Sequence, residues 1–231
     1  IPFSEFEDID KELKLILIEN FRLDNAAFLK IKSLTEQIAR LQKFYPAYDG
    51  LFLKLNDDVK DLEYRKEIID KIEKVFNRFG EVKSDSSPIL KQLRGDISHA
   101  KKAIQENFNR ALTGLTSTEY LDDIKESIVD DQRVLAVKSA YKKRVPGRVL
   151  GLSKTGSITY IQPESVVKHQ FKLREDIEEE KKEVDKILRK LTFEISEFQP
   201  QLYSYQKYIF DLDIIRAKAK FADKVGGILP K

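Results

Sequence analysis

The sequence predicts a mainly α-helical protein in which long helices carry one small antiparallel β module. On both sides of the chain's centre, apolar residues recur every three or four positions, which is the spacing of amphipathic helices. Between Gln132 and Pro163, short runs of β-branched and aromatic residues are broken by Pro146-Gly147 and Thr155-Gly156, the pattern of strands and turns. We expect three or four strands between about Ile128 and Ile161, and a helix content far above the usual third.

The first 87 residues are expected to form core helices. Their apolar stripes predict helices over Phe3–Glu19, from Asp24 or Asn25 to just before Tyr45, and over Val59–Phe79. Gly80 provides a stop for the third of these helices. The most apolar helix is the last in the chain, from Tyr203 to about Val225, so we expect it to be central in the core.

Two further helices flank the β module and are expected to run antiparallel, side by side. Ser87 and Pro88 are typical of a helix start, and the helix that follows carries a narrow apolar stripe, which implies one partner helix. The partner resumes after Pro163. Placing Leu112 opposite about Val167 predicts that Lys101 and Lys102 lie beside the acidic run Glu178–Glu180.

These patterns divide the chain into three parts. Residues 1–87 and 200–231 form a helical core. Residues 88–124 and 164–199 form two lever helices, and residues 125–163 form the β-rich module.

The positive charge of the chain is concentrated in and around the module. From Lys125 to Lys168 there are nine basic and four acidic residues, and from Gln132 to Pro163 there are seven basic residues and no acidic one. This local excess is typical of a protein with an anionic partner, although a solvated lysine-rich hairpin would show the same pattern. The predicted nucleic-acid contacts are Lys138, Lys142, Lys143, Arg144, Arg148 and Lys154.

Residues typical of catalysis or metal binding are sparse. There is no cysteine, which excludes disulfides and fits a reducing compartment, and no apolar run approaches membrane-spanning length. The glycines do not follow a phosphate-loop or dinucleotide-binding spacing. His99 and His169 are far apart and have no partners at ligand spacing, so we interpret them as surface residues. The sequence therefore predicts a chain that is not an enzyme by itself, with no metal or cofactor.

Three segments resemble the MutS superfamily. RVLAVKSAYKKRVPGRVLGLSKTGSITYIQPESVV (residues 133–167) is similar to its lever-and-clamp region, and closest to the bacterial MutS paralogue branch that lacks the mismatch-recognition domain. SDSSPILKQLRGDI (residues 84–97) resembles the start of that branch's ascending lever helix. FDLDIIRAKAKFADKVGGILPK (residues 210–231) resembles the stretch before its ATPase domain. Two departures are Gln162, where the family usually has glutamate, and His169-Gln170, where asparagines are common.

The resemblance implies a DNA-binding lever and clamp region of a DNA repair or recombination-control ATPase, which contacts the phosphate backbone without base readout. It implies double-stranded or branched DNA as partner, a homodimer in the full-length protein, a cytoplasmic location and no membrane. ATP and Mg²⁺ would belong to a further domain. The alternative is a structural coiled-coil arm for protein docking or ribosome-associated quality control.

Overall fold

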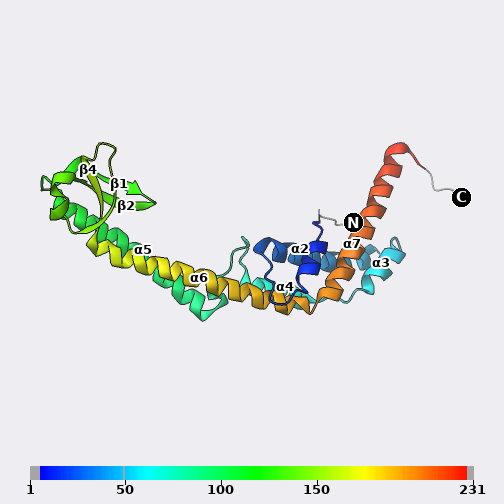
Figure 1. Cartoon of the computed structure of the whole chain (residues 1–231). Helices are drawn as coiled ribbons and strands as arrows, with labels where there is room; N and C mark the ends of the chain where they lie inside the picture. The colour runs from blue at the N-terminus through cyan, green and yellow to red at the C-terminus, as the bar shows by residue number, and fades with distance from the viewer. Residues whose placement is uncertain (1–5, 49, 228–231) are drawn as a thin grey trace. The chain divides into compact units, whose positions relative to one another are not determined.

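A computed structural model describes residues 6–48 and 50–227 and confirms the predicted fold class (Figure 1). Helices predominate, and one four-stranded antiparallel sheet interrupts them. The chain forms two compact units. One contains the described residues up to Ser86 and from Val184 onward, and the other is Ser87–Glu183. The finer division into lever helices and module stays a prediction.

The first unit is helical and has its core around α2. Its elements are α1 (Asp10–Leu15), α2 (Asn25–Phe44), the 3-10 helix η1 (Tyr45–Tyr48), α3 (Leu53–Lys60), α4 (Lys66–Val75), the 3-10 helix η2 (Ser84–Ser86), the last turns of α6 (Glu164–Ser196), and α7 (Gln199–Val225). Helix α2 packs against α3, α4 and α7 and buries one apolar face. The Asp24 side chain caps α2 by accepting a 2.8 Å hydrogen bond from the Ala27 amide, as predicted.

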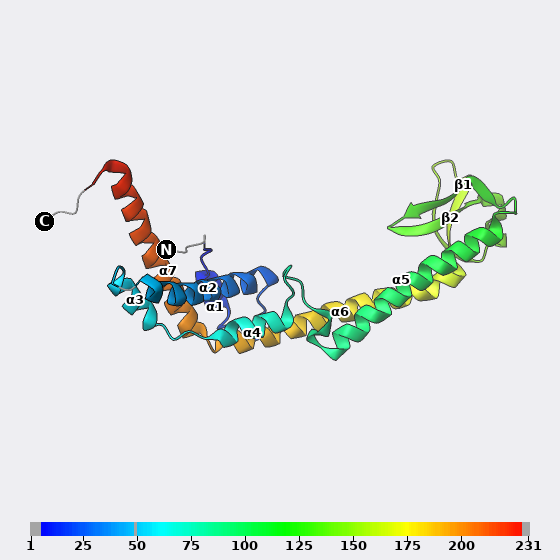
Figure 2. The same ribbon diagram turned by 180° about the vertical axis from the view of Figure 1, so that it is seen from behind.

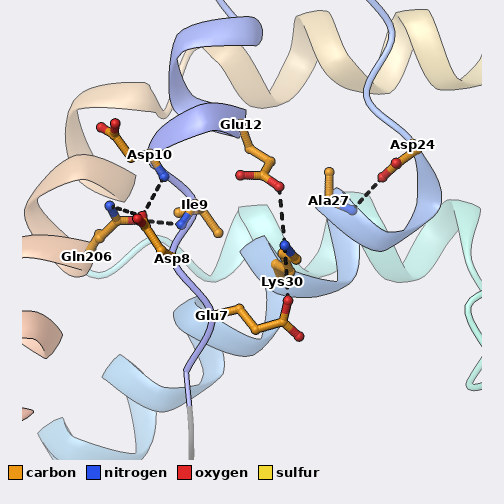
Figure 3. Close-up of polar contacts among 9 residues, drawn as sticks. All are labelled: Glu7, Asp8, Ile9, Asp10, Glu12, Asp24, Ala27, Lys30 and Gln206. Carbon is orange, nitrogen blue, oxygen red and sulfur yellow. Dashed lines mark hydrogen bonds and ion pairs between the residues drawn. The ribbon is translucent and has the colours of Figure 1, made fainter.

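Helix α1 is much shorter than the predicted Phe3–Glu19, whose first three residues lie outside the described chain. The Gln206 side chain on α7 accepts from the Ile9 amide and donates to Asp8, both at 2.8 Å, and the Asp8 carboxylate also accepts from the Asp10 amide (Figure 3). These bonds fix the segment before α1 in a non-helical conformation. Lys30 of α2 lies between two carboxylates, 3.0 Å from Glu7 and 3.4 Å from Glu12.

The predicted helix over Val59–Phe79 was wrong, because the chain breaks between α3 and α4. The Arg65 amide donates to the Tyr205 hydroxyl at 2.8 Å, and that hydroxyl donates to the Glu63 carbonyl oxygen at 2.6 Å. A continuous helix would use both backbone groups internally. Gly80 adopts a left-handed conformation (φ 77°) beyond α4.

The last helix is central in the core only in its first half. Leu202, Tyr205, Ile209 and Leu212 are buried, whereas beyond Leu212 no described side chain of α7 is buried. The prediction of a core helix up to Val225 was therefore wrong for the second half, since no other described element of the unit covers that part.

The second unit pairs α5 (Pro88–Leu115) with the first turns of α6, and both views show the two helices side by side (Figures 1 and 2). Ser87 caps α5, since its hydroxyl accepts from the Leu90 amide at 3.0 Å. It also donates to Glu183 at 2.7 Å. Between the helices, Ile97 and Ala100 are buried with Leu173 of α6.

The predicted register of this helix pair was wrong. Arg94, not Lys101 or Lys102, is paired with Glu180, at 2.7 Å, while Lys102 is near Glu106 of its own helix at 3.9 Å. Phe108 lies in one buried cluster with Val166 near the start of α6, and α5 continues two more turns, to Leu115. The prediction assumed that both helices end level with each other, which shifts the pairing by about two turns.

The sheet lies where α5 ends and α6 begins (Figure 1). Its strand order is β1-β2-β4-β3, with every neighbouring pair antiparallel. The strands are β1 (Leu121–Val129), β2 (Gln132–Lys138), β3 (Gly147–Leu152) and β4 (Ile158–Pro163). Strands β2 and β3 flank β4 and run in the same direction, so the 3-10 helix η3 (Ser139–Arg144) belongs to a crossover past β4.

One face of the sheet packs on the helices. The buried cluster consists of Phe108, Leu121, Leu135, Val137, Val145, Ile161 and Val166. Strand β1 begins at Leu121, earlier than the predicted start near Ile128. The sequence did not predict this earlier start, because Asp122 and Asp123 follow Leu121 and aspartate is rare in strands. The register shift between Leu121 and Glu126 shows that these residues lie in a bulge.

Candidate nucleic-acid interface

The crossover after β2 presents three adjacent cations between two anchors. Tyr141 packs against the module's buried cluster, with its ring 5.0 Å from that of Tyr120, and Val145 is itself buried in that cluster. Lys142, Lys143 and Arg144 lie between these anchors and are all exposed. Because Tyr141 and Val145 already anchor both ends of this short segment, its three charged side chains can stay in water without further ordering of the backbone.

Lys138 and Lys154 lie at the same end of the sheet. Lys138 ends β2 opposite Ile158, and Lys154 lies in the turn between β3 and β4. Ser139 ties the two segments together, because its amide donates to the Ser157 carbonyl oxygen at 2.8 Å and its hydroxyl donates to the Gly156 carbonyl oxygen at 2.7 Å. Gly156 allows the tight turn, with a φ of 71°.

Arg148 lies at the opposite end of β3, opposite Gln162 of β4. Four steps of strand, about 13 Å, lead from Arg148 to Leu152, and Lys154 lies two residues further, in the turn. The structure therefore does not gather the six predicted residues at one point. It arranges them along the end of β2, the crossover and the strand β3.

We call these six residues the basic band: Lys138, Lys142, Lys143, Arg144, Arg148 and Lys154. All six are exposed, and none forms an ion pair with any residue that the structure describes. Unpaired cations next to one another repel and add nothing to folding stability. Their charges are therefore available to an anionic partner.

The seventh cation of this segment, Arg133, has a structural role. Its guanidinium lies 4.2 Å from the centre of the Phe108 ring, pairs with Glu126 at 2.5 Å and donates to Asn109 at 3.1 Å. Arg133 thus ties β2 to both β1 and α5. The sequence contains no signal that separates Arg133 from the band, because Lys138 flanks the same buried run of β2.

Two exposed apolar residues beside the band were not predicted. Val149 and Leu152 of β3 are 53% and 60% exposed. The sequence did contain a signal, because apolar residues at 149, 150 and 152 cannot all face the same side of a strand.

The residue types that bind metals do not come together in the part of the chain that the structure describes. No group of three or more His, Cys, Asp or Glu side chains among them could hold a metal ion. His99 is exposed and His169 is partly exposed. Within the same part of the chain, no helix combines the length and apolar character needed to cross a membrane.

Fold and site together define a mainly α-helical protein whose paired helices carry a small, basic β module. No family model matches the chain. It is similar to proteins named Endonuclease MutS2: 30% identical over 230 residues to that of Carboxydothermus hydrogenoformans, and 31% identical over 227 residues to that of Ligilactobacillus salivarius. These alignments cover 99% and 94% of this chain.

The Endonuclease MutS2 of Caldanaerobacter subterraneus is 30% identical over 238 residues. The chain spans less than a third of the length of these relatives, between 28% and 29% of each. The similarities support a MutS-related family for this chain.

Proposed function

We propose that the basic band contacts the phosphate backbone of DNA as the clamp of a MutS-like DNA-binding protein. The observation that carries the proposal is the set of six exposed cations without an ion pair, on a segment that has no acidic residue between Gln132 and Pro163. Duplex DNA has one negative charge per ~1.7 Å of its axis with both strands counted, so a band longer than about 13 Å spans several phosphates.

The composition of the band favours backbone contact over base readout. Four of its six members are lysines, which act as point charges toward phosphates. Base readout relies more on bidentate arginine, asparagine and glutamine. The affinity should therefore depend weakly on DNA sequence and strongly on salt.

The similarity to proteins named Endonuclease MutS2 extends the proposal to the whole protein. We propose a place in the branch that lacks the mismatch-recognition domain, with a role in DNA repair or recombination control as a homodimer in the cytoplasm. ATP and Mg²⁺ would be bound outside this chain, whose own role is binding. One departure from the branch has a local explanation: buried Gln162 donates to Gln132 at 2.7 Å.

A second candidate function is docking of a protein, including a ribosome-associated partner. The observation that favours it is the exposure of Val149 and Leu152 beside the band. An apolar contact would respond little to salt, whereas phosphate contacts weaken steeply as salt rises.

The experiment compares two triple alanine variants by fluorescence anisotropy with duplex and branched DNA from 50 to 200 mM salt. The first replaces Lys142, Lys143 and Arg144. The matched control replaces Lys91, Lys101 and Lys102, three exposed cations of α5, and removes the same charge.

We expect the first variant to bind all sequences more weakly. The slope of log affinity against log salt should become shallower by about 0.9 for each phosphate that the variant no longer neutralises. The control should keep most of its affinity. An equal decrease of affinity in both variants would show that only the net charge of the chain matters. Unchanged binding by the first variant would rule out the band as a clamp.

A further inference from the structure

The two edge strands of the module have opposite charges. Edge strand β1 carries Asp122 and Asp123, which form no ion pair with any described residue. Edge strand β3 begins at Gly147 and carries Arg148, and Lys154 follows two residues after its end. Strand β1 also contains Lys125 and Glu126, so its net charge is −2, whereas β3 and the turn after it carry only cations. The sheet therefore has a net acidic edge and a basic edge.

Both edges also expose large apolar side chains. Ile124 and Ile128 of β1 are 71% and 70% exposed, and Val149 and Leu152 of β3 are 53% and 60% exposed. Elsewhere in Ser87–Glu183, only Ile89 and Phe171 are large apolar residues with comparable exposure. Exposed apolar residues that gather at particular places indicate an interaction surface.

Within one module the two edges cannot neutralise each other. Strands β2 and β4 lie between them, so three interstrand spacings, about 14 Å, separate β1 from β3. That distance exceeds the Debye length of ~8 Å at physiological salt. A second copy of the module offers each edge a surface of the opposite net charge.

We propose that the β1 edge of one copy docks against the β3 edge of a second copy of this chain. Strands β1 and β3 run in opposite directions, so a second module in the same orientation meets the first with antiparallel edges. With the two sheets level, Asp122 and Asp123 lie beside the Leu152 end of β3, toward Lys154. Ile128 lies beside the other end of β3, near Arg148 and Val149.

The charges select this head-to-tail arrangement over a two-fold one. Two-fold pairing of β3 with β3 places the cations Arg148 and Lys154 of one copy opposite the same cations of the other. Two-fold pairing of β1 with β1 places the aspartates of one copy opposite those of the other. Like charges directly across an interface destabilise it. Charged edges commonly prevent sheets from joining, and here they prevent only the joining of like edges.

The contact is expected to be weak and open-ended. The register shifts in β1 and β3 interrupt a continuous ladder, so the docking rests on side chains and covers a small area. A head-to-tail contact leaves one free edge at each end, so assembly continues beyond a dimer as concentration rises. Docking would also cover Arg148 and Lys154 of the basic band.

The test is sedimentation velocity of the chain at low salt and rising concentration, without nucleic acid, so that the DNA proposal can fail without affecting it. One variant carries Asp122→Lys and Asp123→Lys, which makes both edges basic. The other carries Arg148→Glu and Lys154→Glu, which makes both edges acidic. A third variant combines all four changes and exchanges the two edges.

The wild-type mass should rise steadily with concentration. Each charge variant alone should associate at least about tenfold more weakly, because the two edges that meet then carry net charges of the same sign. An equimolar mixture of the two variants should associate again, and so should the four-fold variant. Recovery in the mixture shows that both variants are folded. A wild-type chain that stays monomeric at millimolar concentration, or variants that associate as well as wild type, would overturn the proposal.

Discussion

Arg94 of α5 and Glu180 of α6 form an ion pair of 2.7 Å between the two helices of the second unit. Their side chains are only 31% and 26% exposed, which makes the pair one of the less exposed of the unit. The Ser87 contact with Glu183, about two turns further toward the start of α5, agrees with this register to within about one turn. Few apolar residues are buried in this part of the seam, so polar pairs help to fix the register.

The first prediction tests that register by a double-mutant cycle. Arg94→Glu and Glu180→Arg should each lower the free energy of unfolding, and the double variant should recover about 0.5–1 kcal/mol, the range for partly exposed pairs. The control cycle uses Lys102→Glu and Glu179→Arg, and its coupling energy should be near zero. A larger coupling energy for the control, measured by urea unfolding, would restore the register expected from sequence.

The second prediction concerns Arg133. Arg133→Ala removes the contact with Phe108, the ion pair with Glu126 and the bond to Asn109, and should destabilise the module by about 1–3 kcal/mol. Arg148→Ala removes the same charge at an exposed, unpaired position and should change stability by less than about 0.5 kcal/mol. Thermal unfolding measures both. Equal destabilisation by the two variants would contradict the separation of Arg133 from the basic band.

The third prediction concerns a glycine in the strand β3. A Cβ atom on Gly147 would overlap the Gln162 carbonyl oxygen and lie 2.7 Å from Cγ2 of Ile161. Gly147→Ala should therefore destabilise the module by about 2 kcal/mol or more, because the obstructing atom belongs to the backbone of β4. Gly95→Ala on α5 meets no atom within 4 Å and should stabilise the chain by about 0.5–1 kcal/mol. Chemical denaturation should show opposite signs for the two variants.

Local rules predicted the parts of the fold that depend on neighbouring residues. The caps at Asp24 and Ser87 follow from side chains within a few residues. The predicted stop at Gly80 was wrong, because α4 already ends at Val75, and Gly80 lies in the turn between the bridged residues Phe76 and Val82. The exposure of the basic band could be predicted for the same reason, since three adjacent cations have no room in a small core.

Features that depend on distant partners could not be predicted. The break before α4 exists because the Tyr205 hydroxyl, 140 residues away, accepts a hydrogen bond from the Arg65 amide. The register of α5 and α6 depends on how far α5 extends under the sheet. The role of Arg133 depends on Phe108 and Glu126, which come from two other elements. No periodicity in the sequence contains this information.

The last prediction is a pH dependence in the first unit. The Tyr208 hydroxyl lies 3.1 Å from the Leu55 carbonyl oxygen and 3.1 Å from the Tyr45 hydroxyl, and its single proton can be donated to either oxygen. Burial, together with the bond to Tyr45, raises the pKa of Tyr208 far above its ordinary value of 10.0. Burial also raises the pKa values of Tyr45 and Tyr205.

An unfolded chain releases the tyrosine proton near pH 10, whereas the folded chain retains it. The stability that depends on Tyr208 is therefore complete below pH 10 and falls as the pH rises above 10, by about 1.4 kcal/mol per pH unit for one proton. Tyr208→Phe should be less stable than wild type at pH 8, because it loses these hydrogen bonds, but its stability should fall less steeply above pH 10. Tyr203→Phe, at a residue that is 54% exposed, should follow wild type at both pH values. Urea unfolding at pH 8 and pH 11 measures the difference, and an equally steep decrease in wild type and Tyr208→Phe would show that Tyr208 ionises freely in the folded chain.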